Sequence, residues 1–379
     1  AIKNDLTVFF LTSRHTQHEL AIDTLRMIRQ RHNINFVAAD IIGKRWMCGL
    51  EGMQGLVSSD FSEYCKSLRE DGKCEPFYNT RIKSKATQLA ENIMNTLSVS
   101  SPNSTDRVSD LCREEKLCPY EVSIEMAKKA DVIITDYYYL FSPNIMENFF
   151  KKTGKDIKKS IIIVDEGHNL PSRLRELLSQ RLSGNMIQRG IKEAKKFGYD
   201  QSIGFLVNIQ DALNNLSKDM EINQEKLIKR KDFMNHCSKG HDYEEIIADL
   251  DFVSESIRES QKMSYISGIA KFMDSWQGPD IGFSRVLSVI RTSKGPLSIL
   301  RYKCLDPSIL SAPLIKQAYS TTIMSGTLSP VETYIDLLGF PKNSLCMELT
   351  SPFPKQNRLN LIVPKTSTKF KPRNPEQYR

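Results

Sequence analysis

The sequence predicts an α/β protein whose parallel sheet is interrupted by two insertions. Short apolar runs of the kind buried on both faces of a sheet recur toward both ends of the 379-residue chain. Helix-like stretches separate these runs, which is typical of a parallel sheet. Two long segments, 44–119 and about 173–292, break the alternation. The chain is also longer than the chains that usually fold around a single hydrophobic core, so we expect two or three domains.

The strands of the sheet are expected at six apolar runs. These runs are 6–11, 34–38, 131–135, 160–164, 321–324 and 359–363. After the first of them, residues 16–31 have helical spacing that would turn Leu20, Leu25 and Ile28 inward.

The two insertions differ in composition. The first holds five cysteines and a polar stretch, NTLSVSSPNSTD, that cannot pack as core. The second is predicted to be helical, because apolar residues recur at helical spacing. Two such sets are Ile246, Leu250, Val253 and Ile257, and Phe205, Ile209, Ala212 and Leu216.

The net charge of +8 agrees with a polyanionic partner, but also with solvated lysine faces. The chain has no apolar run of the ~18 to 20 residues that span a bilayer and no signal-peptide layout. We therefore expect a cytoplasmic protein without a membrane partner, associated with the nucleoid, or a nuclear one in a nucleated cell. We also expect a monomer.

Two carboxylates and a histidine end the run 160–164. Asp165, Glu166 and His168 follow it directly, and a carboxylate pair is costly to desolvate without a cation. In a Walker B element such an aspartate holds Mg²⁺, and the glutamate polarises the water that attacks the γ-phosphate of ATP. A strand that simply ends in a polar loop is the alternative.

Four cysteines of the first insertion can hold a metal centre. Cys48, Cys65, Cys74 and Cys118 are widely spaced, which favours a [4Fe–4S] cluster over the tight pairs of most zinc modules. Cys112 is a rival ligand. The remaining cysteines are most simply buried small hydrophobes; these are Cys237, Cys304 and Cys346.

A series of stretches resembles one family when taken in order. They are KRWMC, GKCEPFYN, LCPYE, ADVIITDYYYLFSP, IIIVDEGHN, RYKCLDPSIL and TTIMSGTLSP. This order resembles that of the XPD family, the iron–sulfur superfamily 2 DNA helicases related to the xeroderma pigmentosum group D protein. The likeness runs from about residue 6 to residue 365.

The resemblance implies an architecture. A RecA-like motor domain would comprise residues 1–43, 120–172 and 293–350, interrupted by a 4Fe-4S domain at 44–119 and a helical arch at 173–292. Residues 351–379 would begin a linker to a second motor domain. Cys48, Cys65, Cys74 and Cys118 would be the cluster ligands, with Cys112 as the spare.

Two further stretches gain roles from the resemblance. Ser325, Gly326 and Thr327, in SGTLSP, would form motif III, which transmits nucleotide state to the DNA path. The alternative there is a helix N-cap at Ser329 followed by Pro330 at the first helical position, and both can hold.

LTSRHTQ, at 11–17, resembles motif Ia, where a helix N-terminus meets a DNA phosphate, with Arg14 as the expected contact. Lys44, Arg45 and Tyr120 would lie beside the cluster. Two positive charges and an aromatic ring suit single-stranded DNA, which binds through its backbone charge and by base stacking. Of Tyr137, Tyr138 and Tyr139, at least two are expected to be core.

The sequence departs from the family at both ends. No G-x-x-x-x-G-K-[ST] loop occurs, and motif Ia begins almost at residue 1. We therefore interpret the chain as a helicase truncated at both ends and inactive by itself.

The expected function is that of an ATP-dependent 5′-to-3′ DNA helicase that uses Mg²⁺ and ATP and acts on single strands and forks. It would serve nucleotide excision repair, with repair-complex proteins as partners. One alternative is a non-catalytic iron–sulfur protein that binds single-stranded DNA. Another is a related iron–sulfur helicase that acts on other DNA structures.

Overall fold

The computed structural model describes residues 1–56, 58–83, 85–261 and 264–362. The chain divides into two compact units, Ala1–Pro341 and Lys342–Arg379. In the described part of the second unit, the one regular element is the short 3-10 helix η4 (Lys355–Asn357). The first unit holds the other elements. Its 3-10 helices are η1 (Ile2–Asn4), η2 (Ile157–Lys159) and η3 (Gly167–Asn169).

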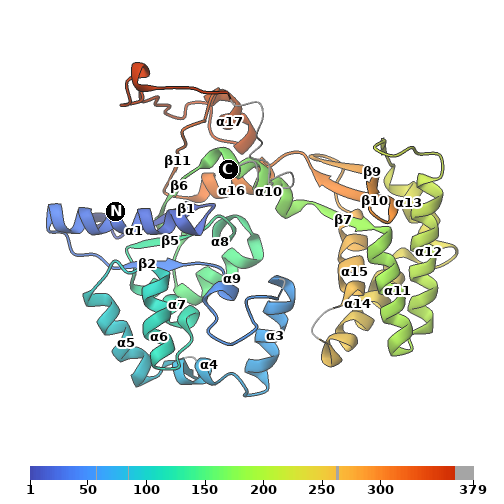
Figure 1. The fold of residues 1–379 in the computed structure, drawn as a ribbon, viewed down its shortest axis with the longest axis horizontal. Helices are drawn as coiled ribbons and strands as arrows, with labels where there is room; N and C mark the ends of the chain where they lie inside the picture. The colour runs from blue at the N-terminus through green and yellow to red at the C-terminus, as the bar shows by residue number, and fades with distance from the viewer. Residues whose placement is uncertain (57, 84, 262–263, 363–379) are drawn as a thin grey trace. The chain divides into compact units, whose positions relative to one another are not determined.

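A five-stranded parallel sheet is the centre of the first unit (Figure 1). In the order β11-β6-β1-β5-β2, its strands are β11 (Ser320–Ile323), β6 (Ser160–Val164), β1 (Thr7–Thr12), β5 (Val132–Asp136) and β2 (Ala38–Ile41). Leu11 pairs with both Val164 and Thr135, so the carboxyl ends of the three middle strands are level. Side chains that follow these strands therefore meet at one edge.

Helices cover this sheet and bury its apolar residues. They are α1 (His15–His32), α7 (Pro119–Lys129), α8 (Tyr138–Phe141), α9 (Pro143–Thr153), α10 (Leu170–Leu178), α16 (Ser308–Gln317) and α17 (Val331–Leu338). Phe9, Leu11 and Ile162 are fully buried in the resulting core. Tyr137 and Tyr139 also lie in this core, as predicted for two of the three tyrosines, while Tyr138 is partly exposed.

The cysteine-rich insertion is built from short helices. They are α2 (Lys44–Met47), α3 (Ser58–Glu70), α4 (Glu75–Thr80), α5 (Gln88–Val99) and α6 (Thr105–Glu114), with a two-stranded ribbon of β3 (Arg81–Ile82) and β4 (Lys85–Ala86). Leu97 and Val108 join the core of the parallel sheet. Met53, Phe61 and Cys65 form a small cluster of their own. The insertion is thus anchored through α5 and α6. The stretch NTLSVSSPNSTD was predicted to be too polar for the core, but Leu97 and the polar residues Ser101, Asn103 and Thr105 are buried, so that prediction was wrong.

The second insertion forms a lobe with a separate core. Its helices are α11 (Gly184–Phe197), α12 (Asp200–Ser217), α13 (Arg230–Ser238), α14 (Tyr243–Ser260) and α15 (Tyr265–Trp276). They pack on an antiparallel sheet of β7 (Gln180–Ser183), β10 (Gly295–Cys304), β9 (Phe283–Thr292) and β8 (Glu225–Leu227). Trp276 and Leu300 are fully buried between helices and sheet. We call this part the helical lobe.

The structure differs from several sequence predictions. On α1 the buried residues are His18, Ala21 and Ile22, and Leu25 packs against them as predicted, whereas Leu20 is 68% exposed and Ile28 is 39% exposed. The helix carries apolar side chains on more than one face, so their spacing did not identify the buried face.

Two of the predicted strands differ from the structure by more than one residue. β2 begins only at Ala38, the last residue of the run predicted as 34–38. Residues 359–362 form no strand, and residue 363 lies outside the described residues.

The helical prediction for 173–292 holds for α11 to α15, but β7, β8 and β9 also lie there, and β10 beyond residue 292 pairs with β9. Cys237 and Cys304 are buried as expected, whereas Cys346 is exposed, because its surroundings in the second unit contain no packed core among the described residues. None of the helices in the described residues is long and apolar enough to span a membrane.

Candidate nucleotide and metal sites

The strand-end carboxylates are held by a sharp turn after β6. The backbone N–H of Asp165 donates to the carbonyl of Leu11 at 2.8 Å, which fixes the end of the strand. Glu166 then takes a left-handed conformation with φ of 49°. A Cβ on Gly167 would lie 2.0 Å from Cγ2 of Ile323, so only glycine fits between this turn and β11. The hydroxyl of Tyr137 donates to the carbonyl of Glu166 at 3.0 Å.

The predicted catalytic and motif III residues meet at the Glu166 carboxylate. Its Oε2 lies 3.1 Å from Nδ1 of His168 and accepts a hydrogen bond from the Ser325 hydroxyl at 3.3 Å. Ser325 Oγ is also 2.6 Å from Nδ1 of His168 and accepts from the backbone N–H of Thr327 at 3.3 Å. A Cβ on Gly326 would meet no other atom within 4 Å. Strand ends far apart in sequence thus share one polar network.

The N-cap predicted beside motif III differs by one residue. α17 begins at Val331 with Pro330 as its N-cap, so Ser329 lies before the cap. A proline cap has no side-chain acceptor, and the stretch therefore does not form the Ser329 cap that the sequence also allowed.

Gln17 is a site residue that the sequence analysis missed. Its side-chain Nε2 donates to Oε1 of Glu166 at 3.5 Å, and its Oε1 accepts from the hydroxyl of Thr12. Gln17 lies in the first turn of α1, within the stretch from which only Arg14 was selected. Arg14 is the exposed N-cap residue of that helix. The sequence could have pointed to Gln17, because this residue follows the end of β1 by about one helical turn, and the end of β1 is level with the end of β6.

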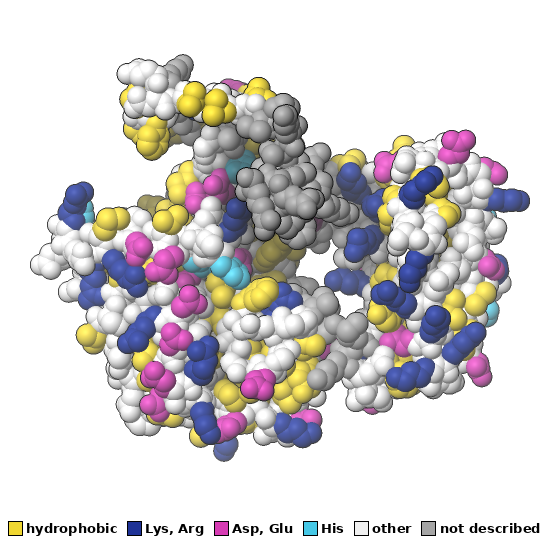
Figure 2. Space-filling view, in the orientation of Figure 1, with side chains coloured by type: hydrophobic (Ala, Val, Ile, Leu, Met, Phe, Trp, Pro, Cys, Tyr) yellow, Lys and Arg dark blue, Asp and Glu magenta, His cyan; other side chains and the backbone are white. Residues whose placement is uncertain are grey.

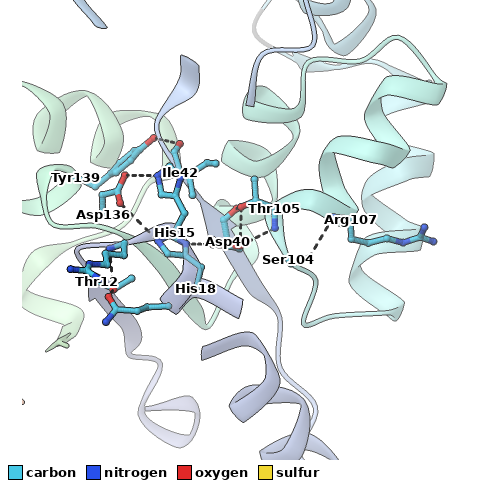
Figure 3. A network of polar contacts seen from close by, with 12 residues as sticks. Thr12, His15, His18, Asp40, Ile42, Ser104, Thr105, Arg107, Asp136 and Tyr139 are labelled. Carbon is cyan, nitrogen blue, oxygen red and sulfur yellow. Dashed lines mark hydrogen bonds and ion pairs between the residues drawn. The ribbon is translucent and has the colours of Figure 1, made fainter. Parts of the chain in front are cut away.

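A second polar network joins α1 to its neighbours (Figure 3). Nδ1 of buried His18 lies 2.5 Å from Oδ1 of Asp40, and Asp40 Oδ2 accepts from both the backbone N–H and the hydroxyl of Thr105 at 2.8 Å. Asp136, at the end of β5, lies 3.9 Å from Nε2 of both His15 and His18. The nearby Asp136 carboxylate raises the pKa of His15 above its ordinary value, although burial opposes it. These contacts fix the helix that carries Arg14 and Gln17.

The four predicted cluster cysteines line one pocket. Cys48, Cys65, Cys74 and Cys118 are all among the residues that line it. Cys112 is fully buried in the core of the parallel sheet and does not line the pocket. The four cysteines that the resemblance implies as ligands therefore share one pocket, and Cys112 lies apart from it.

The sulfur environment suits an anionic metal centre. Cys74 and Cys118 are the N-cap residues of α4 and α7, where the helix dipole favours negative charge. Burial raises the pKa of Cys48 and Cys74, and raises that of Cys118 to about 12, while backbone hydrogen bonds at Leu50, Phe77 and Glu121 partly oppose burial. Such hydrogen bonds to sulfur tune iron–sulfur clusters. Among the described residues, no three His, Cys, Asp or Glu side chains lie close enough together to bind one metal ion in their present conformations.

The predicted DNA contacts beside the cysteines make internal contacts. Nζ of Lys44 lies 3.8 Å from Oε1 of Glu121 and 5.1 Å from the centre of the Tyr120 ring. Burial would raise the pKa of Glu121, but Lys152, Lys44 and Arg81 outweigh burial and lower it. Arg45 donates to the carbonyl of Leu56 at 2.5 Å, and its guanidinium stacks on Trp46. Lys44, Arg45 and Tyr120 therefore remain predictions as DNA contacts.

Comparison with known proteins points in one direction. The DEAD_2 family model matches residues 10–187. The chain is 26% identical to the ATP-dependent DNA helicase XPD of Sulfolobus acidocaldarius, covering 92% of this chain and 55% of that protein. It is 25% identical to the general transcription and DNA repair factor IIH helicase subunit XPD/RAD3 of Saccharomyces cerevisiae, covering 70% and 42%. The chain spans about half the length of these relatives.

Solved structures share the fold. One described as XPD_Helicase has a TM-score of 0.57 at 23% identity, covering 91% of this chain and 54% of that chain. Another, described as Truncated XPD, has a TM-score of 0.58 at 22% identity, covering 91% and 88%. The parallel sheet and its insertions therefore have known counterparts.

Proposed function

Because the chain belongs to the XPD family of superfamily 2 DNA helicases, we propose that it forms the first motor domain, with its two insertions, of an ATP-dependent 5′-to-3′ helicase. The observation that carries this proposal is the network in which Ser325 and His168 both contact the Glu166 carboxylate. A carboxylate that only forms the polar end of a strand would not need contacts from two separate segments of the chain. The substrates would be single-stranded DNA and forks, in nucleotide excision repair.

The chemistry follows from the two carboxylates. Asp165 accepts the Glu166 backbone N–H at 2.9 Å through Oδ1, which orients its other oxygen, Oδ2, as the group that would hold Mg²⁺. A bound Mg²⁺ neutralises charge on the β and γ phosphates. Glu166 would orient the attacking water and accept its proton. Ser325 and His168 would set the position of that carboxylate, so a shift of the loop after β11 changes the site.

The cysteine pocket would hold a [4Fe–4S] cluster. Four thiols line one space, and the fifth cysteine of the insertion lies elsewhere. Bound as thiolates, these residues would connect α2, α3, α4 and α7. Their role would be structural, since these segments are distant in sequence and share only a small apolar core.

A direct test uses a motor that adds a phosphate-binding loop and a second motor domain to this chain. We expect it to unwind a duplex with a 5′ single-stranded tail and not one with a 3′ tail, with ATP hydrolysis stimulated by single strands. DNA binding without stimulated hydrolysis would favour the non-catalytic iron–sulfur alternative. Unwinding restricted to other DNA structures would favour the related helicases.

A further inference from the structure

The sheet of the helical lobe places basic side chains on the face opposite its core. Leu182, Leu287 and Leu300 lie directly opposite one another across β7, β10 and β9, and all three are fully buried. Successive residues of a strand point to opposite faces. Arg181 and Arg301, each adjacent to one of these leucines, therefore point away from the helices.

Two arginines face each other on this outer side. The register of β7 and β10 pairs Arg181 directly with Arg301, and Lys303 lies two residues further along β10 on the same face. Directly opposite side chains have Cβ atoms about 4.5–5.5 Å apart, and like charges in such pairs destabilise a sheet. The pair therefore works against the stability of the fold.

No carboxylate among the described residues forms an ion pair with Arg181, Arg301 or Lys303. Arg301 donates to the hydroxyl of Ser288, which satisfies one donor but neutralises no charge. The acidic residue on this face is Glu225, which pairs with Ser288 from the far strand β8. The positive charges at the β7 end of the sheet are thus left without compensation by the protein.

A guanidinium pair of this kind suits phosphate. The planar guanidinium forms two parallel hydrogen bonds to phosphate oxygens, and a row of such groups follows a polyanionic backbone. Lys and Arg side chains are frequent on the visible face of the helical lobe (Figure 2). A solvated basic face is the simpler alternative, but it does not explain two arginines directly opposite each other.

We propose that Arg181, Arg301 and Lys303 form an anion-binding row that contacts the phosphate backbone of single-stranded DNA. This proposal rests on the proposed helicase function and extends the DNA path onto the helical lobe. The cost of the like-charge pair is relieved when phosphates lie between the side chains. The like-charge pair therefore lowers the stability of the DNA-free protein, and DNA binding offsets this cost.

Binding by the full chain tests the row directly. The affinity for a fluorescent oligothymidine is measured by anisotropy at several salt concentrations. Arg181→Gln, Arg301→Gln and Lys303→Gln should each weaken binding several-fold and reduce the slope of log K against log salt by about 0.7. Lys192→Gln, the same charge change at an exposed residue of α11, should alter neither quantity.

A second measurement separates a binding role from a structural one. Arg181 is exposed, so Arg181→Gln should raise the unfolding temperature of the DNA-free protein while it weakens DNA binding. A lowered unfolding temperature would show that the arginine supports the fold and would overturn the inference. Equal competition by polyglutamate at matched charge would also overturn it, because any polyanion would then suffice.

The outcomes also distinguish this inference from the function on which it rests. If the folded chain binds no single-stranded DNA, the proposed function fails and the row fails with it. If the chain binds but the three variants keep the parental affinity and salt slope, only the row is wrong.

Discussion

Nδ1 of His168 lies 2.6 Å from the hydroxyl oxygen of Ser325, although 157 positions separate the two residues in the chain. Both also contact Oε2 of Glu166. The loop after β11 is thereby connected to the carboxylate after β6. In the proposed motor, this connection would allow a change at one loop to alter the position of the Glu166 carboxylate.

Removing the serine hydroxyl should uncouple hydrolysis from DNA. In a motor that adds a phosphate-binding loop and a second motor domain to this chain, Ser325→Ala deletes the hydrogen bond to Glu166 and the contact with His168. We expect DNA-stimulated ATP hydrolysis to fall about tenfold, since a hydrogen bond to a charged group contributes about 1.5 kcal/mol. Steady-state hydrolysis with and without oligothymidine measures the effect. Ser329→Ala, an exposed serine of the same stretch, is the control. Equal stimulation in both variants would exclude the coupling role.

The cysteine pocket predicts a selective loss of iron. Chain purified without oxygen should contain about four iron and four sulfide per molecule. Cys74→Ser removes a pocket thiol and should abolish this content, whereas Cys112→Ser alters a core position and should retain it. Iron and sulfide analysis of the folded variants provides the measurement. Stoichiometric zinc without sulfide, in protein prepared with ample iron, would contradict the cluster.

His15 predicts a change of stability with pH. Its pKa is raised above 6.5 in the folded protein by the nearby Asp136 carboxylate, with a smaller contribution from Asp40. A raised folded pKa means that the stabilisation is complete below 6.5 and is lost as the pH rises through the folded pKa. His15→Gln and Asp136→Asn should both reduce the pH dependence of the unfolding temperature in this window. An unchanged profile in both variants would show that the pair is too solvated to matter.

Much of the sheet could be predicted because its strands are buried on both faces. β6 has the predicted bounds, and β1, β5 and β11 differ from the predicted bounds by one residue at each end. An apolar run between polar turns identifies such a strand without tertiary information. β2 was misplaced because the apolar run before it continues into the strand, so its start depends on pairing with β5.

The site was predictable where chemistry follows a strand end. Asp165, Glu166 and His168 stand next to an apolar run, and Ser325 follows another. Gln17 and the buried His18–Asp40 pair were missed because their partners come from other strands, and only the order of strands in the sheet brings them together. The outward arginines likewise depend on the register of β7 and β10.

The most direct test of the proposed role of Asp165 and Glu166 in ATP hydrolysis is the ATPase rate of Glu166→Gln. It is measured with saturating single-stranded DNA, in a motor that adds a phosphate-binding loop and a second motor domain to this chain. The amide keeps the size of the carboxylate but cannot accept a proton from water, and Asp165 still holds Mg²⁺. We expect nucleotide binding at the parental affinity, hydrolysis lowered by about 10² to 10⁴ and no unwinding. Asp165→Asn should weaken Mg·ATP binding as well. If Glu166→Gln hydrolyses ATP at the parental rate, the two carboxylates are only the polar end of β6 and the helicase mechanism proposed for this chain is wrong.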